Sequence, residues 1–379
     1  MLIFDPTMER ILHSTFLIDG VPQELTPADI LQECSLPGVV PAGEDGGQVA
    51  DETLDITADS GRFYEMDMDS LADAVLALGR RPLPLPFAAS YTAGRIARAL
   101  IDAIWMGGHF RLGDLELKGE WKWNDRQMGN MAAFYASVEK AGEYMDALGL
   151  RFKELQFSVG SPSVHFKAVT NPGEEDPEEE EETLFRELPF RTAHPRISSR
   201  RRCPASILPE TSDWLIYIPF DSCDYRLGGS AAAVAAASTP PTAAEVGDAD
   251  YFIDCYEVVR ELVEDGIVKA GATVGEGGLL PTLRTMASTT GADISVGDIC
   301  RAYGEIPLRV LFSEVPGVIL QIADLDYDYI DAELLLQDVA YFPLGHPTPG
   351  SAAVSVLSSD APGLGSILGS LLNTLEGED

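Results

Sequence analysis

Basic residues are scarce in this sequence: 26 Lys and Arg stand against 61 Asp and Glu in 379 residues, which gives a formal net charge of −35. A chain this acidic repels nucleic-acid phosphates and anionic lipid. We therefore expect no nucleic-acid partner and no membrane partner. Composition leaves open whether the acidic excess is an adaptation to salt or an acidic interaction surface.

Cysteine is rare as well, and its spacing argues against the usual cysteine-based sites. The five cysteines lie far apart, with no CxxC pair and no Cys/His pair at metal-ligand spacing. The opening MLIFDPTMERIL has no basic stretch followed by an apolar one, and no run of about 18 apolar residues occurs. We therefore expect a reduced, cytoplasmic chain without an export signal or a membrane span. The cysteines are Cys34, Cys203, Cys223, Cys255 and Cys300.

Apolar residues are plentiful enough to build sizeable cores: they make up 45% of the chain, and charged residues 23%. This balance is typical of globular proteins. At about 150 residues per domain, the length corresponds to two or three domains or one large one. The clearest interruption is GEEDPEEEEE at residues 173–182, which is too acidic to enter a core. We interpret it as a solvated loop or linker; a docking site for a basic partner is the alternative.

Hydrophobic periodicity divides the rest of the chain into helices and strands. Apolar residues recur at helical spacing over 91–106, 127–148 and 251–268, whereas TSDWLIYIPF, 308–312 and 317–322 have the character of strands. This mixture predicts an α+β protein with two successive domains. The predicted organisation is a divergent segment at 1–80 that belongs with the first domain, a first domain at 81–172, an acidic linker at 173–189, a second domain at 190–347, and a flexible tail at 348–379 with a short docking helix at 367–375.

Several short motifs occur in a fixed order along the chain. They are LPFAAS from Leu85, KGEWKWNDRQMGNMAAFYASVEKAGEYMDALGL from Lys118, FSVGSPSVHFK from Phe157, RLGGSAAA from Arg226, GEGGLLPTL from Gly275 and LFSEVPGVILQI from Leu311. Together they resemble the second half of formylglycinamidine ribonucleotide amidotransferase (FGAM synthase), the large enzyme of purine biosynthesis, and more broadly the aminoimidazole ribonucleotide synthetase-like family. The resemblance implies tandem N-type and C-type domains of that family, the first with a sheet that builds dimer-like barrels.

The resemblance also implies where a nucleotide and a metal would bind. Matching positions assign nucleotide binding to Gly160, Ser163, Gly228, Gly229, Ser230, Glu276, Gly277 and Gly278. Asp221 and Glu276 are the acidic residues that remain near the family's metal-ligand positions. We expect the four glycines at 228, 229, 277 and 278 to lie at tight backbone positions of one cleft, where no side chain fits.

Most of the charged groups that the family's chemistry needs are replaced. Mg²⁺ bridging a triphosphate needs carboxylates at fixed positions, but the family's metal-binding Glu and Asn fall at Ala97 and Ile101, and the Lys of its SGKDSM loop falls at Ser161. We therefore interpret the chain as a degenerate FGAM synthase-like protein without catalytic activity or cofactor. Its role would be structural, or it would bind another protein chain in a homo-oligomer or a larger assembly. The alternative is an active or partner-complemented FGAM synthase component that uses ATP and Mg²⁺.

Overall fold

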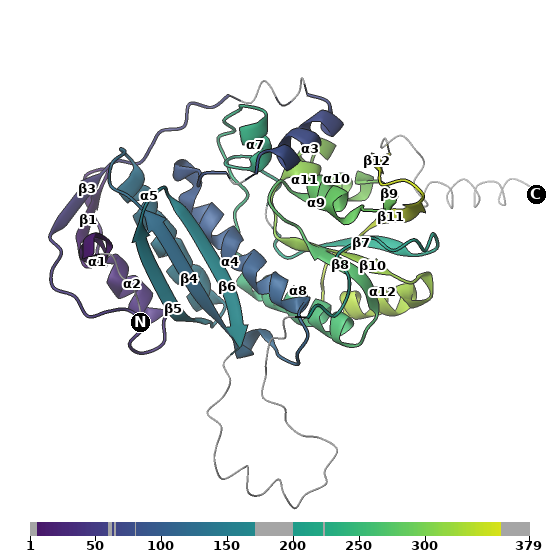
Figure 1. The fold of residues 1–379 in the computed structure, drawn as a ribbon, viewed down its shortest axis with the longest axis horizontal. Coiled ribbons are helices and arrows are strands. Elements are labelled where there is room, and N and C mark those ends of the chain that lie inside the picture. Colours follow the sequence, from purple (N-terminus) through teal and green to yellow (C-terminus); the bar gives the residue numbers. More distant parts are fainter. Residues whose placement is uncertain are drawn as a thin grey trace, which may run out of the picture.

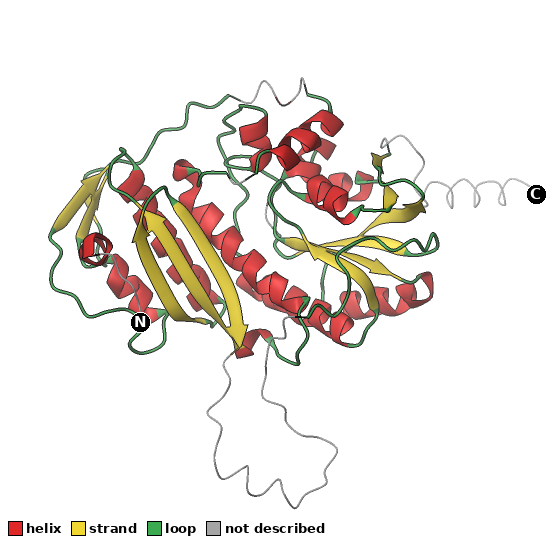
Figure 2. Ribbon diagram, in the orientation of Figure 1, coloured by secondary structure: helices red, strands yellow, loops and turns green. Residues whose placement is uncertain are grey.

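The computed structural model describes residues 6–59, 63, 66–79, 81–170, 200–222 and 224–357. The acidic linker predicted at 173–189 and the helix predicted at 367–375 lie outside this described part. Helices and sheets are both prominent, as Figure 2 shows, and the predicted α+β class is confirmed. Within the described residues, no helix is long and apolar enough to cross a membrane.

The first region is a three-stranded sheet covered on one face by two long helices (Figure 1). The strands are β4 (Leu115–Trp123), β5 (Arg151–Val159) and β6 (Ser163–Thr170), in the order β5-β4-β6, and the helices are α4 (Ala88–Ile104) and α5 (Asn130–Ala147). Along β4, Leu117, Trp121 and Trp123 are buried, whereas Lys118 and Lys122 are exposed. Successive side chains of a strand point to opposite faces, so the apolar half of β4 packs on the helices. The helices predicted at 91–106 and 127–148 are confirmed.

Residues 6–51 attach a small second sheet to this region. Its elements are α1 (Pro6–Leu12), β1 (Thr15–Ile18), β2 (Val21–Pro22), α2 (Pro27–Glu33) and β3 (Gln48–Asp51), with the strand order β2-β1-β3. The carboxylate of Asp51 accepts hydrogen bonds from the backbone N–H groups of Gly129 (3.0 Å), Met131 (2.8 Å) and Ala132 (3.3 Å) at the start of α5. The first N–H groups of a helix lack partners within the helix. The Asp51 carboxylate provides these missing hydrogen-bond partners and thereby ties the N-terminal segment to α5.

The second region is a six-stranded sheet with helices on both faces. Its strands are β7 (Trp214–Pro219), β8 (Val268–Thr273), β9 (Thr290–Ile294), β10 (Gly317–Ile322), β11 (Phe342–Pro349) and β12 (Val354–Val356), in the order β12-β9-β11-β7-β10-β8. Helices α8 (Ala249–Glu264) and α12 (Tyr327–Leu336) lie on one face, and α9 (Leu279–Met286), α10 (Gly297–Tyr303) and α11 (Pro307–Phe312) lie on the other. Ile216 and Ile218 of β7 join the core under α8, whereas Leu215 and Tyr217 join the core under α9. Both faces of β7 are therefore buried, as its apolar sequence predicts.

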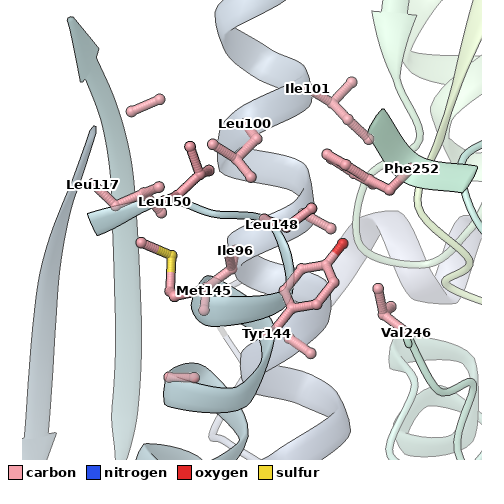
Figure 3. Packing of buried hydrophobic residues seen from close by; sticks show 14 of the residues in the cluster. Ile96, Leu100, Ile101, Leu117, Tyr144, Met145, Leu148, Leu150, Val246 and Phe252 are labelled. Carbon is pink, nitrogen blue, oxygen red and sulfur yellow. The ribbon is translucent and has the colours of Figure 1, made fainter. Parts of the chain in front are cut away.

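A single core connects the two regions. Figure 3 shows Leu100 of α4 directed toward Leu117 of β4, and Ile101 of the same helix directed toward Phe252 of α8. At the end of α4, the indole N–H of Trp105 donates a hydrogen bond to Thr273 Oγ1 in β8 (2.8 Å). Helix α4 thus packs against both regions.

Helix α3 (Met68–Ala77) belongs with the second region. It packs against α7 (Ala231–Ala235) and α9. Residues 66–79 therefore pack against the second region, whereas we expected all of residues 1–80 to belong with the first domain.

Two local expectations are wrong. Residues 308–312 form part of α11 and not a strand, because Pro307 opens the segment at a position that suits a helix start; a short apolar run fits a buried helix as well as a strand. The second error is the start of a flexible tail at 348. Strand β11 continues to Pro349, and Val354–Val356 form β12, which pairs in parallel with β9. The Gly-, Ser- and Ala-rich composition of this segment conceals a short edge strand.

Candidate functional site

Charged side chains from four separate segments meet where α4 faces the second region. They are Arg81, Arg95, Arg98, Glu276 and Glu314, here called the arginine–glutamate cluster. Arg95 and Arg98 lie on α4, Arg81 precedes it, and the glutamates lie in the loops before α9 and after α11. Three guanidiniums and two carboxylates give the cluster a net charge of 3 − 2 = +1, in a chain whose overall charge is −35.

Glu314 is the centre of the cluster, and its carboxylate is fully engaged by the protein. Oε2 lies 2.5 Å from Arg81 Nη2 and 3.6 Å from Arg98 Nη2, and Oε1 accepts hydrogen bonds from the backbone N–H groups of Ala231 (2.8 Å) and Gly277 (2.9 Å). Burial raises the pKa of Glu314, but the guanidiniums of Arg81 and Arg98 and the two N–H groups outweigh it, so the pKa is lowered. Glu314 is thus a buried carboxylate anion that joins three loops to α4.

Glu276, the residue expected to bind nucleotide or metal, is held by two arginines and a tyrosine. Its Oε1 lies 2.6 Å from Arg95 Nη1 and accepts a hydrogen bond from the Tyr91 hydroxyl (3.2 Å), while Oε2 lies 3.4 Å from Arg81 Nε. The Arg81 guanidinium also lies over the Tyr91 ring, 5.0 Å from its centroid. To bind a cation, Glu276 would have to give up two arginine partners.

Asp221, the other expected metal ligand, has a structural role at the start of α8. It follows β7, is only 3% exposed, and accepts hydrogen bonds from the backbone N–H groups of Gly247 (2.9 Å) and Asp248 (3.1 Å) through one oxygen. Asp248 in turn caps α8 by accepting the N–H of Tyr251 (3.1 Å). In the described residues, no three or more His, Cys, Asp or Glu side chains are grouped so that they could hold a metal ion.

The RLGGSAAA motif forms a turn that leads into the short helix α7. Ser230 is the N-cap of this helix: its hydroxyl accepts the N–H of Ala233 (3.1 Å) and donates to the carbonyl of Leu227 (2.8 Å). The carbonyl of Gly229 accepts a hydrogen bond from Arg81. A Cβ atom at Gly229 would lie 2.8 Å from Phe87 Cδ2, and the backbone there has φ +66°. The hydroxyl and carbonyl of this turn are therefore already used within the chain.

The GEGGLLPTL motif forms the turn before α9, and its glycines are also confined. Gly277 and Gly278 have φ values of +91° and +89°, and a Cβ atom at Gly278 would lie 2.6 Å from the carbonyl oxygen of Ser313. At Gly228, a Cβ atom would lie 2.4 Å from the carbonyl oxygen of Thr242. The prediction of tight backbone positions is confirmed for all four glycines, but only Gly228 and Gly229 line the cavity beside the cluster.

Beside the cluster lies a cavity of about 30 Å³. Its lining includes Phe87, Tyr91, Arg98, Gly228, Gly229, Ser230 and Glu314. A cavity of this size holds about two water molecules, whereas drug-sized ligands occupy pockets of roughly 300–1,000 Å³. Two polar atoms of the buried Arg98 guanidinium group, Nε and Nη1, have no hydrogen-bond partner. The cavity is large enough for water and too small to enclose a nucleotide.

Other expected positions lie elsewhere. Gly160 and Ser163 flank the turn between β5 and β6, where the N–H of Gly160 donates to the carbonyl of Trp123 (2.8 Å), and neither residue lines the cavity. Ala97 and Ile101 are fully buried in the core. The structure therefore brings together Gly228, Gly229, Ser230, Glu276 and Gly277 around the cluster, with Gly278 one residue beyond it.

Sequence reasoning missed the four residues that dominate the site. Glu314 was available as the acidic residue of the LFSEVPGVILQI motif, whereas Arg81, Arg95 and Arg98 match no motif. Helical spacing places Arg95 and Arg98 on one face of α4, and two arginines on a largely apolar helix are the signal that was present. Only the folded chain shows that this face meets two glutamates.

Comparison with known proteins gives a consistent result at low identity. The chain is 24% identical over 263 residues to the probable phosphoribosylformylglycinamidine synthase (FGAM synthase) of chloroplasts and mitochondria from Arabidopsis thaliana, covering 67% of this chain and 17% of that protein. It is 25% identical over 270 residues to the human phosphoribosylformylglycinamidine synthase, covering 68% of this chain and 18% of that protein. No protein-family model matches the chain.

Among solved structures, PurL of T. maritima in complex with FGAR has a similar fold. The TM-score is 0.54 at 13% identity, and the match covers 73% of this chain and 42% of that one. This chain therefore spans less than a fifth of the length of the curated relatives and less than half of the structural one. The resemblance inferred from the motifs is confirmed: the chain has the aminoimidazole ribonucleotide synthetase-like fold of FGAM synthase-related proteins.

Proposed function

We propose that this chain is a non-catalytic relative of FGAM synthase that uses no nucleotide or metal and acts as a structural or partner-binding protein. The observation that carries this proposal is the state of Glu276 and Glu314. Arg81 lies within ion-pair distance of both, Arg95 pairs with Glu276, and Arg98 lies within 3.6 Å of Glu314. Where the family's reaction needs carboxylates that are free to hold Mg²⁺, this chain has carboxylates neutralised by its own arginines.

Electrostatics favours the same conclusion. A divalent cation entering the cluster would meet three guanidiniums and two carboxylates, a net charge of +1. Buried like charges repel strongly because the local dielectric constant is low. The small cavity adds a steric argument, since a volume of about 30 Å³ is too small to enclose a base and a ribose.

The second candidate is an active or partner-complemented FGAM synthase component that forms an amidine with ATP and Mg²⁺ in purine biosynthesis. It is supported by the relatives, which are FGAM synthases, and by Arg98, which lines the cavity and has a guanidinium group that suits an anion such as a phosphate. In this candidate, the catalytic groups that the chain lacks would come from another chain.

A synthase assay separates the two candidates. The full chain would be incubated with formylglycinamide ribonucleotide, ATP, Mg²⁺ and either ammonia or glutamine, and product would be measured beside Asp221→Ala and Glu276→Ala variants. Loss of one stabilising group typically costs about 10²–10³ in rate, so we expect no product above background. Turnover well above background would disprove the proposal, and its loss in a Glu276→Ala variant that still folds would identify Glu276 as a metal ligand.

A further inference from the structure

Helix α12 and the turn before it expose an apolar surface on the outer side of the second region. The exposed fractions are 92% for Leu325, 49% for Tyr329, 68% for Leu335 and 78% for Leu336. We call these four residues the α12 ridge. Tyr329 and Leu336 are seven positions apart on α12, a spacing that places both side chains on one face of the helix, and Leu325 lies in the turn directly before it.

The exposure does not come from a loosely attached helix. On the opposite face of α12, Ile330 and Leu334 have no exposed surface and belong to the core that includes α8 and β10. The hydroxyl of Tyr341 donates a hydrogen bond to Asp331, which fixes the middle of the helix. In Figure 1, α12 lies at the periphery of the second region, away from α4 and the first region. The ridge is therefore a firmly held surface that faces solvent in the described chain.

Carboxylates surround the ridge, and basic residues are missing from its own segment. Asp324, Asp328 and Glu333 lie within or beside it, and residues 321–357 contain no Lys or Arg. From the neighbouring helix and the turn after it, Glu261 and Asp265 also act on Tyr329. The charge of Glu333 raises the pKa of the Tyr329 hydroxyl most, followed by desolvation and by the charges of Asp265 and Glu261. The three carboxylates make this surface negative.

We propose that the α12 ridge is the docking site for a partner protein segment that presents an apolar face flanked by Lys and Arg, such as a basic amphipathic helix. Contiguous apolar surface rimmed by polar groups marks interaction sites, and opposite charges at the rim select the partner and speed the encounter. A second copy of this chain is a poor occupant, because two acidic rims would face each other in chains that each carry −35. This inference rests on the proposed partner-binding role and gives that role a place and a chemistry.

The test uses a fluorescent 18-residue amphipathic helical peptide built from Leu and Lys as the probe. Fluorescence anisotropy would measure its binding to the full chain and to a Leu335→Gln/Leu336→Gln double variant. We expect the double variant to bind about tenfold more weakly. Val21→Gln is the matched control, because Val21 is also an exposed apolar residue (59%) but lies in β2, far from the ridge in sequence. It should bind as the unmodified chain does.

Two further peptides test the chemistry of the partner. A Leu–Glu peptide should not bind because of charge, and a Ser–Lys peptide should bind much more weakly because it lacks an apolar face. Equal binding of the Leu–Lys peptide to the chain and its double variant would overturn the proposal, as would equal binding of the Ser–Lys peptide. Self-association of the chain that the double variant abolishes would also overturn it, in favour of a second copy. The synthase assay is independent of the ridge, so activity there would disprove the proposed function without affecting this binding result.

Discussion

Arg81 and Glu314 form a buried ion pair between residues 233 positions apart, with 2.5 Å between Nη2 and Oε2. Their side chains are 2% and 9% exposed. Removing one member of a buried pair leaves the other charge without compensation, at a cost of about 3–5 kcal/mol. We therefore expect Glu314→Gln to lower the free energy of unfolding by about that amount, as measured by urea denaturation.

The matched control for this variant is an exposed pair. Arg301 and Asp298 are 69% and 63% exposed, and exposed ion pairs contribute about 0–1 kcal/mol. Asp298→Asn should therefore change the free energy of unfolding very little. Equal effects of Glu314→Gln and Asp298→Asn would contradict the buried state of the cluster.

The pH dependence of stability provides a second test of Glu314. Burial opposes ionisation, but the nearby guanidiniums and N–H groups hold the pKa of Glu314 below its ordinary value of 4.5. A carboxylate with a lowered pKa stabilises the fold above its unfolded-state pKa, and this stabilisation is lost as the pH falls through the folded-state pKa. The stability difference between the unmodified chain and Glu314→Gln should be constant near neutral pH and shrink below about pH 4.5. Urea denaturation of both proteins from neutral pH to below pH 4.5 measures this difference. A stability difference that stays constant in acid would contradict the lowered pKa of Glu314.

Gly278 should tolerate no side chain. Its φ is +89°, and a Cβ atom would approach the carbonyl oxygen of Ser313 to 2.6 Å. Gly149 is the control, because its φ is +67° but its Cβ position is open. Gly149→Ala should cost about 1–2 kcal/mol from backbone strain alone, and Gly278→Ala should cost clearly more because the backbone must also shift. Thermal denaturation of both variants measures the difference, and equal losses would show that the turn before α9 has room.

Thiol reactivity should follow burial. Cys34 is 2% exposed, and burial raises its pKa to about 11, so little thiolate forms at pH 8. Burial also raises the pKa of Cys300, but this side chain is only partly buried. Iodoacetamide labelling of the folded chain, read site by site with mass spectrometry, should modify Cys300 faster than Cys34. The reverse order would contradict the packing of α2 against α5.

The sequence predicts helices α4, α5 and α8 and strands β7 and β10 because each has a long or strongly apolar pattern of one period. It fails for residues 308–312, where a short apolar run does not distinguish a buried strand from a buried helix. It also fails for Val354–Val356, whose strand conformation depends on pairing with β9 and not on local composition.

The candidate site was predictable only where the backbone determines it. The tight backbone positions at Gly229 and Gly278 could be predicted, because glycine in a turn motif indicates a position where a side chain does not fit. The partners of Glu276 could not, since Arg81 and Arg95 reach it only after α4 packs on the second region. Ion pairs across nearly 200 residues leave no local pattern.

Calorimetric titration of the full chain with ATP in the presence of Mg²⁺ is the most direct test of the proposal that this chain is non-catalytic because its own arginines engage the carboxylates of the arginine–glutamate cluster. With millimolar ATP we expect no binding heat, either for the unmodified chain or for the Glu276→Ala variant. A Kd of about 1 mM corresponds to a binding free energy of about −4 kcal/mol, and weaker binding escapes detection. Saturable binding in the micromolar range that requires Mg²⁺ and is lost in Glu276→Ala would contradict this conclusion, because it would show that Glu276 exchanges its arginine partners for a metal-bound nucleotide.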